Sequence, residues 1–149
     1  MRHALILSAA LLGLAACGGS GADGEDAAGK EEAGWRDACI TIANDEEGQE
    51  EIAGMGTDAD GFCDCADKFI AEMPAEDQEK AKTTMIKVAD GMNEGGQSTE
   101  DVVGKMMSDA MSKPDDPDAQ AMSEGVRLVG RMIDDIDSSY EDNGSCVVG

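Results

Sequence analysis

Histidine is almost absent: the 149-residue chain has one, His3, at the start of an apolar N-terminal run. Removal of that run would leave no imidazole, which excludes Ser–His and Cys–His catalysis and histidine-ligated zinc from the remainder. The P-loop, the dinucleotide fingerprint, the HExxH run and the nucleophile elbow are also missing. We therefore expect that the protein is not an enzyme and has no catalytic residue and no cofactor.

Aromatic and basic residues are scarce as well. One Trp, one Tyr and two Phe offer little for the aromatic platforms that carbohydrate-cleaving sites usually need, so an enzyme relying on two carboxylates is the third-ranked alternative. Eleven Lys and Arg stand against 33 Asp and Glu, giving a net charge of −22. Such a charge repels phosphates and anionic headgroups, which excludes nucleic acid as a partner, and it favours solubility.

Long apolar runs are absent except at the N-terminus. There, Met1-Arg2-His3 precedes an apolar stretch, Ala4 to Ala16, that has the length and composition of a signal-peptide core and is too short for a permanent transmembrane helix. The stretch ends in Leu14-Ala15-Ala16-Cys17, which resembles the lipobox of bacterial lipoproteins. The resemblance implies that residues 1–16 are a signal peptide, that cleavage precedes Cys17, and that lipid such as palmitate on Cys17 anchors the protein to a membrane.

The same resemblance implies an address in the cell envelope. In enterobacterial lipoproteins, Asp after the lipidated cysteine favours the inner membrane. Gly18 stands there in this chain, so we expect the outer membrane, with the domain facing the periplasm or the cell surface. The stretch at 17–34 is rich in Gly, Ala and acidic residues, which cannot bury a core, and we expect a flexible tether with an end-to-end distance of ~20–25 Å.

The rest of the chain, residues 35–149, has helical periodicity and no alternating strand pattern. We expect an all-α domain, a compact antiparallel bundle of four to five helices stapled by disulfides. The predicted helices cover 35–44, 61–73, about 75–91, 99–113 and 117–140, and an acidic, Gly-containing connection at 45–60 has room for a helical turn. In the last helix, spacings of three and four predict a packing seam of Ala119, Met122, Val126, Val129, Ile133, Ile136 and Tyr140.

Four cysteines remain after Cys17, and an even number in an exported domain predicts two disulfides. Cys63 and Cys65 are two residues apart and point to nearly opposite sides of a helix, so each must pair elsewhere. This leaves two connectivities open. Because Cys65 shares the apolar stripe of its helix and Cys39 lies on an apolar face, we slightly favour Cys39–Cys65 with Cys63–Cys146. The rival is a redox or soft-metal site, but acidic neighbours would raise a thiol pKa there.

Two patterns favour a periplasmic metal-binding protein as the alternative. Met107 and Met111 form an i, i+4 pair of the thioethers that suit Cu(I), although most of the methionines lie in apolar stripes. The stretch from Gly56 to Asp67 resembles part of an EF-hand calcium loop, but it lacks the Asp at position 1 and the Glu at position 12. We prefer Asp58 or Asp60 as a helix cap and assign no metal ligand.

The anchor, the tether and the missing catalytic motifs together favour one class of function. We expect a membrane-anchored cell-envelope lipoprotein that acts as a non-enzymatic interaction or scaffold module. Its partners would be the membrane, through the lipid, and another envelope protein.

Overall fold

A computed structural model describes residues 34–149, and all regular structure within them is helical. The predicted signal peptide, the lipobox with Cys17 and nearly all of the tether fall in residues 1–33 and lie outside the described part. A helix covers residues 34–43, and five more follow it: α2 (Glu46–Met55), α3 (Ala59–Glu72), α4 (Ala75–Gly95), α5 (Thr99–Ser112) and α6 (Pro117–Asn143). The all-α prediction is confirmed. None of these helices is both long and apolar enough to cross a membrane.

Local capping explains most of the helix boundaries. The Asp58 carboxylate accepts a hydrogen bond from the Gly61 N–H at 2.8 Å and starts α3, which confirms Asp58 as the cap. Ser98 does the same for α5 through the Asp101 N–H, at 3.2 Å. Each cap satisfies an N–H that the first helical turn leaves without a partner. α2, α4 and α6 end at glycines in the left-handed conformation: Gly56, Gly96 and Gly144.

The prediction of four to five helices is wrong for residues 34–149, which hold six, because the expected connection at 45–60 contains α2. Only Ile52 of this helix is buried, and the other large apolar side chain, Met55, is half-buried. A helix that buries so little has no apolar stripe to show in its sequence. α2 is stabilised by packing against the main hydrophobic core, which contains Ile52 and which Met55 contacts.

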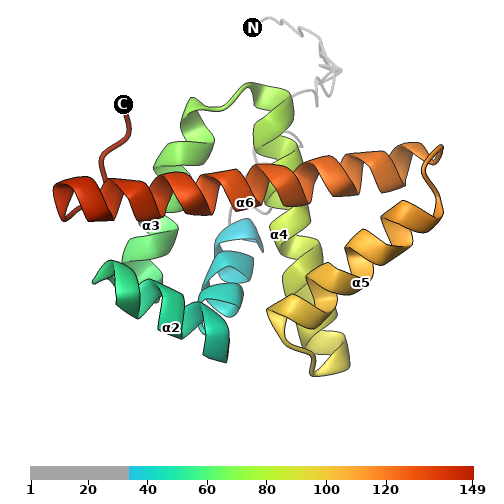
Figure 1. The fold of residues 1–149 in the computed structure, drawn as a ribbon, viewed down its shortest axis with the longest axis horizontal. Helices are drawn as coiled ribbons and strands as arrows, with labels where there is room; N and C mark the ends of the chain where they lie inside the picture. The colour runs from blue at the N-terminus through green and yellow to red at the C-terminus, as the bar shows by residue number, and fades with distance from the viewer. Residues whose placement is uncertain (1–33) are drawn as a thin grey trace, which may run out of the picture.

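The helices are arranged as a short antiparallel pair crossed by one long helix (Figure 1). α3 and α4 run in opposite directions on either side of the turn at Met73 and Pro74. α6 packs across both of them, rather than beside them as in a simple bundle, and also contacts α2 and α5. One long helix, α6, therefore contacts each of the helices α2 to α5.

The packing seam of α6 lies about one residue away from the predicted one. Of the seven residues expected there, only Ile136 is buried, while the buried positions are Gly125, Leu128, Met132, Ile136 and Ser139. The predicted seam left out two large apolar residues that are buried, Leu128 and Met132, as well as two small residues. Gly125 and Ser139 lie in the seam for other reasons: Gly125 allows a close approach to α4, and Ser139 binds the C-terminal tail.

One large core and one small one hold the domain together. The large core joins the 34–43 helix, α2, α3, α4 and the C-terminal half of α6, with Trp35, Ile70, Met132 and Ile136 almost fully buried. The small core contains Val88 and Met92 of α4 and Val102 of α5. α5 and the first half of α6, which we call the α5–α6 arm (99–127), therefore lie outside the large core (Figure 1).

Candidate functional site

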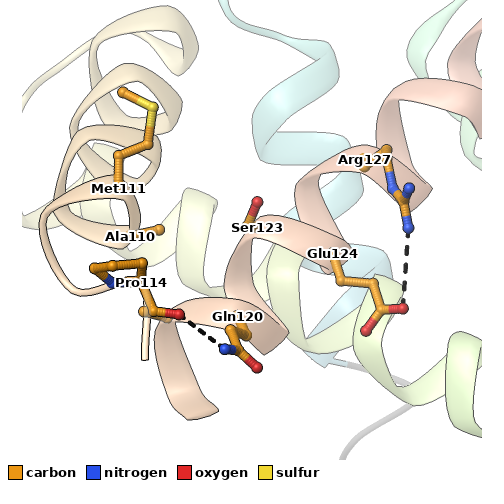
Figure 2. A pocket seen from close by; sticks show the side chains of 8 residues that line it. Ala110, Met111, Pro114, Gln120, Ser123, Glu124 and Arg127 are labelled. Carbon is orange, nitrogen blue, oxygen red and sulfur yellow. Dashed lines mark hydrogen bonds and ion pairs between the residues drawn. The ribbon is translucent and has the colours of Figure 1, made fainter. Parts of the chain in front are cut away.

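The α5–α6 arm carries an open groove of about 500 Å³ between the end of α5 and the first turns of α6 (Figure 2). Met111, at the mouth, is 75% exposed, the most exposed of the large hydrophobic side chains in residues 34–149. A flexible, polarisable methionine side chain left this far in water beside a groove is a candidate contact for a partner. The residues that line the α5–α6 groove are Ala110, Met111, Pro114, Ala119, Gln120, Ser123, Glu124 and Arg127.

The turn between the two helices gives the groove a fixed shape. Asp116 caps α6, accepting hydrogen bonds from the N–H groups of Asp118 at 2.9 Å and Ala119 at 3.4 Å. The Gln120 side chain then donates from Nε2 to the Pro114 carbonyl oxygen at 2.8 Å, as Figure 2 shows. Because these bonds tie the turn to α6, the two walls of the groove are held at a set distance.

Charged side chains close the far end of the groove. Glu124 accepts a hydrogen bond from Lys80 at 2.9 Å and lies 4.0 Å from the Arg127 guanidinium. The hydrogen bonds that Lys80 donates to Glu76 and to Glu124 raise the pKa of Lys80, and the second of them lowers the pKa of Glu124. Glu124 is therefore ionised at neutral pH and held in place from α4. The Ser123 hydroxyl, half-buried between the two ends, makes no hydrogen bond to another described residue.

Acidic residues surround the other end of the groove, at the turn between α5 and α6. The turn reads Lys113-Pro114-Asp115-Asp116-Pro117-Asp118, and all six residues are exposed. Asp109, one turn earlier on α5, binds Lys105 at 2.7 Å, which lowers the pKa of Asp109. Among the described residues, Asp115 and Asp118 form no ion pair. The apolar groove thus ends in a tip of carboxylates that only Lys113 partly offsets. We call Asp115, Asp116 and Asp118 the acidic tip.

Sequence reasoning missed this groove. It placed Met111 in the stripe of its helix and Ala119 in the seam of the next, but it assigned no role to Gln120, Ser123, Glu124 or Arg127. The available signal was the position of Met111, the last residue of the stripe before Pro114. An apolar residue in the last turn of a helix has no following turn of its own helix to cover it, so its side chain can face a neighbouring element or solvent.

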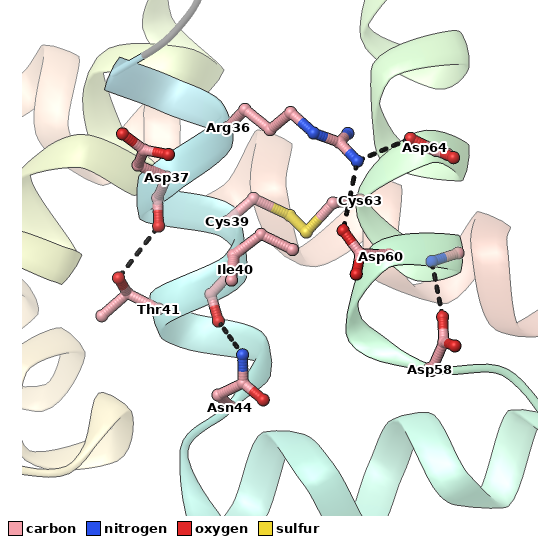
Figure 3. Close-up of a disulfide and its surroundings, with 11 residues drawn as sticks. Arg36, Asp37, Cys39, Ile40, Thr41, Asn44, Asp58, Asp60, Cys63 and Asp64 are labelled. Carbon is pink, nitrogen blue, oxygen red and sulfur yellow. Dashed lines mark hydrogen bonds and ion pairs between the residues drawn. A yellow bond between two sulfur atoms is a disulfide. The ribbon is translucent and has the colours of Figure 1, made fainter.

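The four cysteines form two disulfides, as predicted, but the favoured pairing is wrong. Cys39 is bonded to Cys63 (Figure 3), and Cys65 is bonded to Cys146. The apolar stripe of α3 that includes Cys65 faces α6 and the tail: Phe69 and Met73 line one hollow together with Asp135 and Val148. Cys63, on the other side of α3, faces the 34–43 helix.

The residues of the calcium-like stretch are used elsewhere. Asp58 caps α3, while Asp60 and Asp64 bind the Arg36 guanidinium at 3.5 and 2.8 Å and tie α3 to the 34–43 helix beside the disulfide (Figure 3). Asp67 is exposed on α3. In the region from 34 to 149, no three His, Cys, Asp or Glu side chains are grouped so that they could hold a metal ion.

The methionines of residues 34–149 differ in solvent exposure and include buried, half-buried and exposed side chains. Met85, Met92 and Met132 are buried in the cores, where they fill space as expected. Met107 is half-buried and Met111 is exposed, so the pair proposed for copper lies on the outside of the arm. The remaining four methionines, all half-buried, are Met55, Met73, Met106 and Met122.

A second concentration of charge lies where α2 meets the start of α5. Between Arg36 and Lys68 the chain has ten Asp and Glu and no Lys or Arg. The Asp45 carboxylate accepts a hydrogen bond from the Thr99 N–H at 3.1 Å and brings the two helices together. The charge of Glu100 is then the largest cause of a raised pKa at Glu47, followed by burial and by Asp45.

Comparison with known proteins finds no matching family model, no similar curated protein and no similar solved structure. The function of this chain is therefore inferred from its own residues, and the α5–α6 groove is its best-defined candidate site.

Proposed function

We propose that this protein is a lipid-anchored component of the bacterial cell envelope that acts by binding another envelope protein through the α5–α6 groove. In this proposal Cys17 carries the lipid, the disulfide-stapled helices form a compact scaffold, and the arm presents the binding surface. The observation that carries the proposal is the 75% exposure of Met111 beside an open groove whose shape the Pro114 turn fixes.

Methionine suits such a surface. Its unbranched, polarisable side chain adapts to partners of different shape, and protein-binding surfaces use it for that reason. The groove is also long rather than enclosed, since it runs from Pro114 past Ser123 to Arg127. An open groove between two helices fits a protein segment better than a small molecule, which pockets usually surround on most sides.

The binding surface can be tested in living cells with a photo-crosslinking amino acid. We expect crosslinks to a discrete protein when the probe replaces Met111 or Ser123, and none when it replaces Ala71, an exposed residue of α3. Equal capture at all three positions, or capture at none, would contradict the proposal.

The anchor requires a separate test. We expect metabolic labelling with palmitate to mark the wild-type protein and not the Cys17→Ser variant, and we expect the variant to leave the membrane fraction. Persistent labelling of the Cys17→Ser variant would show that the lipid is attached to another residue.

A further inference from the structure

We infer that the α5–α6 groove receives a cationic amphipathic helix of the partner, with its apolar face in the groove and its Lys or Arg residues against the acidic tip. This inference rests on the proposed function and adds the chemistry of the partner. Two features support it: the pattern of charge around the groove, and the length and lining of its apolar part.

The charge pattern argues against a second copy of this chain and favours a basic partner. Two chains that each carry a net charge of −22 repel one another, whereas a cationic segment is attracted from a distance. Close to the groove, Asp115 and Asp118 are exposed and have no ion pair among the described residues. The cations nearby are already engaged or outnumbered: Lys105 binds Asp109, Arg127 lies next to Glu124, and Lys113 is one cation in a turn that carries three Asp residues.

The apolar part of the groove, formed by Ala110, Met111, Pro114 and Ala119, would receive the apolar face of a helix. Three of the lining residues are small, Ala110, Ala119 and Ser123, and they leave room for large side chains from a partner. On α6 the lining residues run from Ala119 to Arg127, eight steps along the helix, or ~12 Å at the helical rise. This distance accommodates about two turns of a partner helix, so apolar anchors at i, i+3 or i+4, and i+7 would contact it.

The test uses the exported chain with Cys17→Ser and three synthetic peptides in a fluorescence binding assay. One peptide is a Leu/Lys sequence with Leu at helical spacing, the second has the same composition without that spacing, and the third replaces each Lys by Glu. We expect only the first to bind. Equal binding of the scrambled peptide would show attraction by charge alone and would overturn the inference, as would preference for the acidic peptide.

Matched variants locate the binding. We expect Ser123→Trp, which fills the groove, to weaken binding about tenfold, while Ala71→Trp leaves it unchanged. We expect Asp115→Asn with Asp118→Asn to weaken binding and to flatten its salt dependence. Asp134→Asn with Asp142→Asn removes the same charge from the other end of α6 and should have little effect. Equal losses in each matched pair would overturn the inference.

Failure of this inference and failure of the proposed function give different results. If groove-specific crosslinking in cells identifies a partner whose captured segment is acidic or extended, the groove is a binding surface but the cationic helix is wrong. If the crosslinking shows no groove-specific capture, the proposed function itself is wrong, whatever the peptides do.

Discussion

Gly125 of α6 lies so close to Thr84 of α4 that no side chain fits between them. A methyl group at residue 125 would overlap the Thr84 hydroxyl and would lie 3.2 Å from its Cβ and 3.3 Å from the Lys80 carbonyl oxygen. This contact fixes the point at which α6 crosses α4. The position of the α5–α6 arm relative to the rest of the domain therefore depends on it.

We expect Gly125→Ala to destabilise the domain. Overpacking costs about 1–3 kcal/mol, of which the better helix propensity of Ala recovers at most about 1 kcal/mol, so we expect a net loss of about 1 kcal/mol in urea unfolding. Gly130→Ala is the matched control on the same helix, because nothing lies within 4 Å of a Cβ there. It should gain about 0.5–1 kcal/mol from propensity alone. A gain in both variants would show that the helices can move apart.

The two disulfides should contribute unequally to stability. Their sequence separations are 24 residues for Cys39–Cys63 and 81 for Cys65–Cys146. In the chain-entropy description, closing these loops stabilises by roughly 3.5 and 4.5 kcal/mol. We therefore expect replacement of the Cys65–Cys146 pair by Ala to cost about 1 kcal/mol more, measured by guanidinium unfolding.

Peptide mapping without reduction provides the control for the pairing itself. A linked peptide containing Cys39 and Cys65 would contradict the connectivity on which this comparison depends. Free thiol at Cys63 would do so as well.

Asp58 distinguishes a helix cap from a calcium ligand. Asp58→Ala removes the acceptor for the Gly61 N–H, and we expect a loss of about 1 kcal/mol. Asp58→Asn keeps an acceptor oxygen and should restore most of the stability, since Asn caps helices as well as Asp does. Thermal unfolding with and without calcium checks both variants. A calcium-dependent rise in Tm that Asp58→Asn abolishes would support the calcium loop instead.

Glu47 and Glu124 should respond to pH with opposite signs. The raised pKa of Glu47 means that folding favours its protonated form. Its contribution to the stability of the fold is therefore present below pH 4.5 and is lost as the pH rises through the raised value. The pKa of Glu124 is lowered, so its contribution is present above pH 4.5 and is lost as the pH falls through the lowered value. At pH 7 we expect Glu47→Gln to raise Tm and Glu124→Gln to lower it.

Both differences should vanish in acid, where the carboxylates and the Gln side chains are equally neutral. The effect of Glu47→Gln should also shrink in 1 M salt. Glu47 and Glu100 are both exposed to solvent, and the screening length falls to about 3 Å at that salt concentration. A Tm change of the same sign in both variants at pH 7 would contradict the electrostatic explanation.

Local signals in the sequence predicted the five helices other than α2. The starts of α3, α5 and α6 follow from Asp58, Ser98 and Asp116, because an N-cap bonds to its own helix and needs no distant partner. Pro74 and Pro114 likewise mark the ends of helices through their own geometry.

Features that depend on distant contacts could not be predicted in the same way. Ile52 holds α2 in place by packing into a core that is built from other helices. Ser139 is buried because the C-terminal tail folds back onto it. The choice between Cys63 and Cys65 depended on which side of α3 meets α6. The α5–α6 groove is of the same kind, because Ser123 and Met111 form one surface only after the turn at Pro114 places the two helices together.

The two disulfides share α3, and this sets how the domain carries mechanical load. A pull applied between residue 34 and the C-terminus can pass through Cys39–Cys63, along two residues of α3, and through Cys65–Cys146 into the tail. The backbones of α2, α4, α5 and α6 lie outside this covalent path. Tension that enters from the N-terminal side is thus carried by the two disulfides and by short pieces of the 34–43 helix and α3, and the α5–α6 arm can keep its shape while this path is under tension.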